Sequence, residues 1–420
     1  MSFNPFEEKP ISLDAAIMDW SKIYPKSYDK NDVDPYTKVR CILMNGTEYE
    51  SVWYSHQFHR HCADNDVRRS LAIVRRNEQQ QQKRVACLKP INETVLETTI
   101  SYEQLAVDLT AIFAQSEPDP YVKKALDFAL LEDFDHLYRY ADLLDFEQGV
   151  HAERLVGNYT EITPGRPTIA EHRHGGDDVK RHVNFSTCDP ITKLHVSIIT
   201  AAEQQTMNYY MNQSAFYFSD LGRRLYQEIG MIEEQHVTQY GSLMDVNVPW
   251  AECWLNHEYT ECYLYYSCYK DETDPYVKKI WEQCLTQEIA HLHEAARILK
   301  KVEKKDWQQV IPNGEFPTLL SFSPQKDYIR KVLRDTVTLT ADGEDYRTVN
   351  SMPDDSKYFF VQERLNKEVD DVPSHEVIKE YIEDSGMDYR YEDFENPVQE
   401  LRDRRHDNVS LARVKEKVNA

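Results

Sequence analysis

Three pairs of a carboxylate and a histidine that lie three residues apart, in the pattern acid-x-x-His, share a further spacing in this chain. These pairs are Asp133 with His136, Glu233 with His236, and Glu288 with His291. Residues i and i+3 lie on one face of an α-helix, so both side chains of a pair can reach one cation. A further glutamate precedes the carboxylate of each pair by 30 residues, and these three are Glu103, Glu203 and Glu258. Carboxylates combined with imidazoles form N/O ligand sets that suit iron or manganese.

The first and third of these patterns belong to an internal repeat. Both copies contain the letters DPYVKK, which begin at Asp119 and again at Asp274, 155 residues further on. The same offset brings Glu103 onto Glu258. The candidate ligands therefore repeat together with the sequence around them.

Proline positions and apolar periodicity divide the centre of the chain into helices. The expected helices span 92–116, 119–146, 189–218, 220–244, 249–271 and 274–304. Each candidate ligand lies on the apolar stripe of its helix. A buried carboxylate without a partner costs several kcal/mol or takes up a proton, and converging carboxylates repel one another. Divalent cations remove both penalties, which favours a metal site over buried, hydrogen-bonded acid–histidine pairs.

Residues 1–90 are expected to form an N-terminal extension. The segment up to about residue 63 contains short aromatic and polar runs and is interpreted as irregular, with a strand near 39–44, whereas 64–88 is interpreted as a helix rich in arginine. A basic helix can bind nucleic acid, but the net charge of the chain is −23. We therefore expect these side chains to pair with the protein's own acidic groups, and no binding of nucleic acid or anionic membranes.

Residues 306–420 are strongly charged and are expected to wrap the bundle or a neighbouring subunit. Helical fragments are predicted near 325–336, 374–385 and 395–405. The central domain is then 91–305. No apolar run approaches membrane-spanning length, and the eight cysteines include no C-x-x-C pair, which suits a reduced, cytoplasmic protein.

The ligand pattern resembles the ferritin-like superfamily of di-metal carboxylate proteins, in which two helices each supply a glutamate and two others each supply Glu-x-x-His. The 30-residue spacing is similar to the oxygen-activating branch, which includes bacterial multicomponent monooxygenases, benzoyl-CoA epoxidase and the ribonucleotide reductase small subunit. Glu258 with Glu261 resembles the E-x-x-E helix of rubrerythrins. The resemblance covers residues 92–305 and implies an all-α bundle of about six core helices that holds two iron ions, or iron and manganese.

The chain differs from that superfamily in having three half-sites where two are needed. One alternative pairs the last two hairpins and treats the first, with Glu103, Asp133 and His136, as a degenerate copy. The ligands would then be Glu203, Glu233, His236, Glu258, Glu261, Glu288 and His291. A second alternative uses the link 147–188 as the long crossover that the superfamily requires, and pairs the first hairpin with either of the others. In a third, all three hairpins surround one larger cluster.

Four tyrosines lie seven residues, or two helical turns, after a candidate ligand. They are Tyr140, Tyr210, Tyr240 and Tyr265. Tyrosine is frequent here, 27 of 420 residues, and it fills amphipathic cores, so packing alone explains such a spacing. The functional hypothesis is that Tyr210, Tyr240 and Tyr265 are redox-active or line a substrate site.

We therefore expect an oxidoreductase that uses a di-iron or iron–manganese centre to activate oxygen or to reduce peroxide. No rubredoxin or flavin motif is present, so its electrons would come from an external donor. The alternatives are a non-catalytic iron- or metal-binding protein and a structural bundle without metal. A homodimer is compatible with the sequence.

Overall fold

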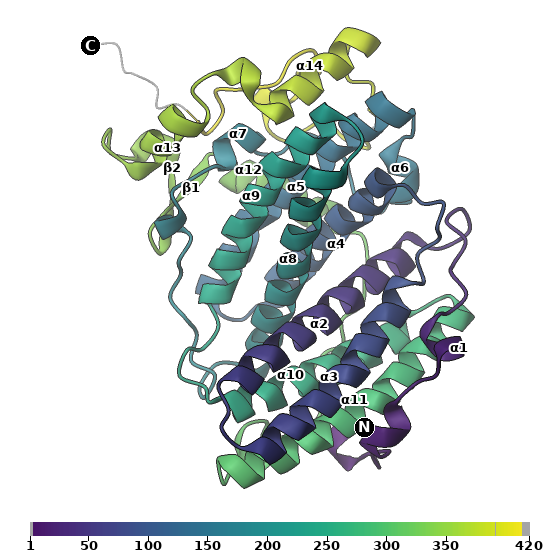
Figure 1. Ribbon diagram of the computed structural model, residues 1–420. Coiled ribbons are helices and arrows are strands. Elements are labelled where there is room, and N and C mark those ends of the chain that lie inside the picture. Colours follow the sequence, from purple (N-terminus) through teal and green to yellow (C-terminus); the bar gives the residue numbers. More distant parts are fainter. Residues whose placement is uncertain (1–2, 391, 414–420) are drawn as a thin grey trace. The chain divides into compact units, whose positions relative to one another are not determined.

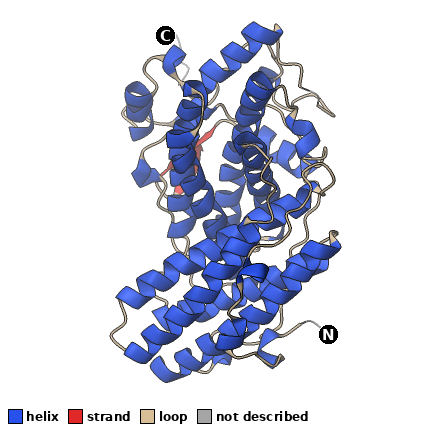
Figure 2. Ribbon diagram, turned by 45° about the vertical axis from the view of Figure 1, so that its right-hand side comes forward, coloured by secondary structure: helices blue, strands red, loops and turns tan. Residues whose placement is uncertain are grey.

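The computed structural model describes residues 3–390 and 392–413, and it consists almost entirely of α-helices (Figures 1 and 2). The prediction of an all-α protein is confirmed. Eight helices of the described residues, rather than about six, are 22 or more residues long. They are α2 (Pro35–Arg60), α3 (Asn65–Ala86), α4 (Val95–Ser116), α5 (Pro120–Gln148), α8 (Pro190–Phe216), α9 (Asp220–Ser242), α10 (Trp250–Asp271) and α11 (Pro275–Val302).

The remaining elements are short. The helices among them are α1 (Trp20–Ile23), α6 (Ala152–Leu155), α7 (Thr168–Glu171), α12 (Lys326–Thr336), α13 (Lys357–Leu365) and α14 (Pro373–Ser385). The strands β1 (Leu339–Asp342) and β2 (Asp345–Thr348) pair in an antiparallel hairpin. Helices predicted near 325–336 and 374–385 are confirmed, whereas 395–405 contains only the 3-10 turn Gln399–Leu401.

The chain divides into two compact units. Unit 1 contains residues 1–93, 183–205 and 245–322, and unit 2 contains residues 94–182, 206–244 and 323–420. These boundaries differ from the predicted order of an extension, a central domain and a second extension. The N-terminal segment is an integral part of unit 1, and the C-terminal helices α12 and α14 pack on α5 of unit 2.

Helical hairpins form the core of each unit (Figure 1). In unit 1, α2 pairs with α3 and α10 with α11, and the two hairpins contact each other through α2 with α10 and α3 with α11. In unit 2, α4 pairs with α5, and α5 also contacts α9.

The predicted strand near 39–44 is wrong, because this segment lies inside α2. Asp34 caps the helix by accepting a hydrogen bond from the Tyr36 N–H, and Pro35 occupies the first turn. The buried side chains of Val39 and Leu43 are four residues apart, which is the spacing of one helix face. The helices α5 and α11 start in the same way, with an aspartate cap followed by proline.

The DPYVKK repeat is a helix start. In each copy the aspartate, Asp119 or Asp274, accepts hydrogen bonds from the next backbone N–H groups, and the following proline occupies the first turn. An aspartate N-cap satisfies donors that have no partner inside the helix, and proline there gives up no hydrogen bond. The repeat therefore fixes where the two ligand-bearing helices begin.

Asp274→Ala should lower the free energy of unfolding by about 1 kcal/mol, because Tyr276 and Val277 lose their N–H acceptor. Asp274→Asn keeps an acceptor oxygen and should retain most of that stability. Urea denaturation followed by circular dichroism measures both variants. An equal loss in the two would assign the effect to the aspartate charge rather than to the cap hydrogen bonds.

Candidate metal centres

Unit 2 contains a cluster of buried acids and histidines on α4, α5 and α9. Its members are Glu103, Asp133, His136, Glu233 and His236. Ligand atoms of the first four all lie within 4.8 Å of one another. His136 Nδ1 lies 3.0 Å from Glu233 Oε1, and His236 Nδ1 lies 3.2 Å from Asp133 Oδ1. The acid-x-x-His pairs of α5 and α9 therefore face each other, as in the crossover alternative.

Each histidine of this cluster has a second carboxylate on its far side. His136 Nε2 lies 2.9 Å from Glu171 Oε2, and His236 Nε2 lies 2.8 Å from Glu132 Oε2. Histidines that ligate metals characteristically place their other ring nitrogen against a carboxylate or carbonyl, which fixes ring orientation and raises ligand basicity. Both histidines thus present Nδ1 to the cluster with the opposite nitrogen anchored.

Glu132 is in turn held by two buried arginines. Arg166 Nη1 and Arg173 Nη1 each lie 2.8 Å from Glu132 Oε1. Burial opposes ionisation of Glu132, but Arg173, His236 and Arg166 together hold its pKa below the ordinary value. Glu132 is therefore an ionised anchor outside the cluster rather than a member of it.

Two of the three carboxylates inside the cluster have a raised pKa. Burial also opposes ionisation of the third, Glu233, but His136 and His236 hold its pKa below the ordinary value. Burial raises the pKa of Glu103 well above its usual range, and the nearby Glu233 and Asp133 raise it further against the effect of His136. Burial also raises the pKa of Asp133. No hydrogen-bond donor reaches Glu103 Oε2 within the described residues. The cluster holds more buried negative charge than its neighbours neutralise.

Glu203 is buried on α8. The boundary between the units falls within this continuous helix, between Gln205 and Thr206. Seven residues after Glu203, on the same helix face, the Tyr210 hydroxyl donates a hydrogen bond of 2.5 Å to Glu103 Oε1.

Unit 1 contains a second buried cluster, on α2, α3, α10 and α11. Its members are Glu48, Glu78, Glu258, Glu261, Glu288 and His291. Two overlapping ligand groups occur. One contains Glu78, Glu258, Glu288 and His291, and the other contains Glu48, Glu78 and Glu261. His291 Nδ1 lies 2.9 Å from Glu78 Oε1 and 3.1 Å from Glu288 Oε2.

The ligand pattern of α2 and α3 was missed in the sequence. Glu48 precedes Glu78 by 30 residues, and Gln81 follows three residues later in the histidine position. Gln81 Nε2 donates a hydrogen bond to Glu288. The pattern acid-x-x-His excludes glutamine, and the interpretation of residues up to about 63 as irregular left out α2, the helix that carries Glu48. The 30-residue spacing alone was the signal that could have found this fourth hairpin.

Within unit 1, the α10–α11 hairpin lies against α2–α3. None of the three pairing alternatives included a hairpin from the N-terminal segment. Asp133 and His136 are full members of the unit 2 cluster rather than a degenerate copy.

Two of the three proposed catalytic tyrosines contact cluster carboxylates. Tyr210 donates to Glu103 in unit 2, and Tyr265 donates to Glu48 in unit 1. Tyr240 is buried, with its ring centroid 6.5 Å from that of His236. Tyr140 is also buried, and its ring lies 5.1 Å from that of Tyr210. Each unit therefore has one tyrosine hydroxyl bonded to the first glutamate of a hairpin.

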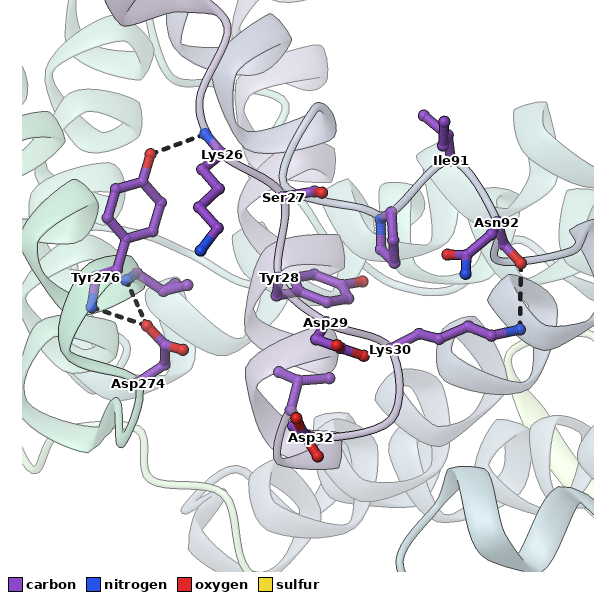
Figure 3. Close-up of a pocket in the computed structure, with 13 residues that line it drawn as sticks. Lys26, Ser27, Tyr28, Asp29, Lys30, Asp32, Ile91, Asn92, Asp274 and Tyr276 are labelled. Carbon is purple, nitrogen blue, oxygen red and sulfur yellow. Dashed lines mark hydrogen bonds between the residues drawn. The ribbon is translucent and has the colours of Figure 1, made fainter.

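A surface pocket of about 520 Å³ in unit 1 is separate from these clusters (Figure 3). Its acids serve other contacts: Asp29 accepts a hydrogen bond from the Asn31 N–H, and Asp274 caps α11. Val277, on its wall, precedes Glu288 by eleven residues of α11, which is about 16 Å along the helix axis. None of the cluster carboxylates lines this pocket.

Comparisons of the chain with protein-family models, with curated proteins and with solved structures gave no match. Among the described residues, no helix is long and apolar enough to cross a membrane. The function must be inferred from the two clusters themselves.

Arg173→Ala should destabilise unit 2 by about 3–5 kcal/mol, because it removes a buried partner of Glu132 and of Asp178. Hydrogen–deuterium exchange of α5 and α9 reports this loss within the unit. The matched control is Arg181→Ala at an exposed position, where a change within about 0.5 kcal/mol is expected. Equal effects of the two substitutions would contradict the anchoring role of Arg173.

Proposed function

We propose that this protein is a ferritin-like, non-haem di-metal oxidoreductase whose redox centre is the unit 2 cluster. It would bind two iron ions, or iron and manganese, and activate oxygen or reduce peroxide with electrons from an external donor. The observation that carries the proposal is the pair of facing histidines, His136 and His236. Each has Nδ1 against shared carboxylates and Nε2 against a separate carboxylate.

The residues present fit a pair of divalent cations. Glu103, Asp133 and Glu233 supply carboxylates, and His136 and His236 supply one nitrogen each. Glu203 precedes Glu233 by the same 30 residues that separate Glu103 from Asp133, and its role as a ligand stays a prediction from that spacing. The three carboxylates carry three negative charges, which offset most of the charge of two divalent ions. A mixed carboxylate and imidazole set with open positions suits iron or manganese.

Bound iron would supply the redox chemistry, and the protein supplies the surroundings. Burial excludes water from the cluster, which strengthens electrostatic interactions there. Glu132 and Glu171 keep the two imidazoles in place. The Tyr210 hydroxyl oxygen lies 2.5 Å from Glu103 Oε1 and donates a hydrogen bond to it, so this hydroxyl can give a proton to that carboxylate or take it back as the charge of the centre changes.

Glu233→Gln should abolish metal binding at this cluster, because it removes a charged ligand that lies between the two histidines. Its matched control is the neighbouring Glu234→Gln, since Glu234 is exposed on the same helix. Full-length protein is loaded anaerobically with Fe(II), its iron content is measured, and its absorbance is followed on exposure to oxygen or peroxide. Wild type and Glu234→Gln should show the same rise in absorbance, and Glu233→Gln should show about tenfold less or none.

The same experiment separates the alternatives. Iron bound by the wild type without any reaction with oxygen or peroxide would favour a non-catalytic metal-binding protein. No iron above trace would leave a structural bundle. An unchanged reaction in Glu233→Gln would place the redox centre elsewhere.

Tyr210→Phe should keep the bound iron but change the rate of the oxygen or peroxide reaction about tenfold or more, because proton transfer by a positioned side chain contributes at least this much. Stopped-flow absorbance measures the rate, and iron content shows that the centre is loaded. The control is Tyr209→Phe, whose ring stacks on Tyr102 and whose hydroxyl donates to the Val95 carbonyl. Equal rates in all three proteins would assign Tyr210 to packing alone.

A further inference from the structure

The unit 1 cluster cannot be explained as a set of ordinary ion pairs. Glu261 is 0% exposed, and no hydrogen-bond donor reaches either of its carboxylate oxygens within the described residues. Its carboxylate lies in one group with those of Glu48 and Glu78. Three buried carboxylates that converge with so few donors repel one another unless a cation lies among them.

The positively charged groups nearby do not neutralise these three carboxylates. His257 Nε2 lies 3.5 Å from Glu261 Oε2, but its Nδ1 pairs with Glu50 at 3.0 Å. His291 faces Glu78 and Glu288 instead. The five glutamates of the cluster therefore lie near only two histidines among the described residues. One of the two, His257, also pairs with Glu50, which lies outside the cluster.

The donor set also differs from that of unit 2. Gln81 occupies the position that a histidine occupies in the other three hairpins. Its Nε2 donates to Glu288, and its Oε1 is buried without a donor. The unit 1 cluster thus offers five carboxylates and one imidazole, that of His291, where unit 2 offers two imidazoles. Oxygen-rich sets suit manganese, magnesium or calcium, whereas imidazole favours iron and later transition metals.

We propose that unit 1 holds a second metal centre, separate from the redox centre and built for hard divalent cations. It has an all-carboxylate subsite formed by Glu48, Glu78 and Glu261. A one-histidine subsite, formed by Glu78, Glu258, Glu288 and His291, adjoins it, and Glu78 is common to both. This inference does not depend on the proposed oxidoreductase activity, since it concerns different residues in a different unit.

The test is Mn(II) binding to metal-free, full-length protein, measured by the loss of the free Mn(II) signal in electron paramagnetic resonance. Glu261→Gln should weaken one class of Mn(II) site about tenfold or more. Glu282→Gln, an exposed position on α11, is the control and should bind like the wild type. Mn(II) binding by Glu261→Gln that equals wild type would overturn the proposal, and so would loss of the same sites in Glu233→Gln but not in Glu261→Gln.

Thermal denaturation separates a lost ligand from a damaged fold. Without metal, Glu261→Gln should melt at the same or a higher temperature than wild type, because it removes a buried charge from among like charges. With Mn(II), the wild type should gain more stability than the variant, because a ligand that binds only the folded state stabilises it. A metal-free variant that is less stable than wild type would show that Glu261 has a structural role, and would count against the site.

The two centres are read out independently. Failure of the oxygen reaction in wild type, with the Glu261-dependent Mn(II) sites intact, would remove the proposed function and leave this centre. Intact oxygen chemistry with no Glu261-dependent Mn(II) binding would overturn the unit 1 centre and leave the proposed function.

Discussion

Buried negative charge is the constraint on which both units depend. The helix α5 shows how the protein treats it. Glu132 is paired with Arg166 and Arg173, and Asp135 with Arg139. Arginine is therefore available in this core and neutralises carboxylates on either side of Asp133. Asp133 itself lies against an imidazole, that of His236, and no arginine pairs with it among the described residues. The core thus supplies guanidinium groups to Glu132 and Asp135 but not to Asp133, which leaves the clustered carboxylate free to accept another cation, as in the proposed function.

The 30-residue spacing has a geometric origin. Glu258 lies thirteen residues before the last residue of α10, and Glu288 lies thirteen after the first residue of α11. The same count holds for Glu103 and Asp133 about the turn between α4 and α5. At 1.5 Å per residue, both ligands of a hairpin stand about 20 Å from their turn, at one height. The aspartate caps at the starts of α5 and α11 fix that height. The DPYVKK repeat therefore determines where the second ligand of each hairpin lies relative to the turn.

Sequence reasoning recovered what is local and periodic. The ranges of α3 to α5 and of α8 to α11 follow from helical spacing and proline positions within each segment. It failed where the determinant is tertiary. Glu132 and Glu171 carry no pattern, because their role arises only where α5, α9 and the link before α8 meet. The division into two units was not predicted from the sequence. Residues 1–93 and 245–322 belong to one unit, although residues of the other unit lie between them in the chain. Gln81 was missed because the pattern was defined by histidine.

The two clusters share a plan but differ in the support given to their histidines. His136 and His236 each have a carboxylate on the far nitrogen, whereas His291 Nε2 has no hydrogen-bond partner within the described residues. A carboxylate there makes an imidazole a stronger donor to a metal, and stronger donors favour a metal that must carry more positive charge. The unit 2 cluster therefore suits an ion that changes oxidation state. The unit 1 cluster, with its oxygen ligands and unsupported histidine, suits an ion that stays divalent. Duplicated hairpins with equal spacing can thus serve two chemically distinct centres within one chain.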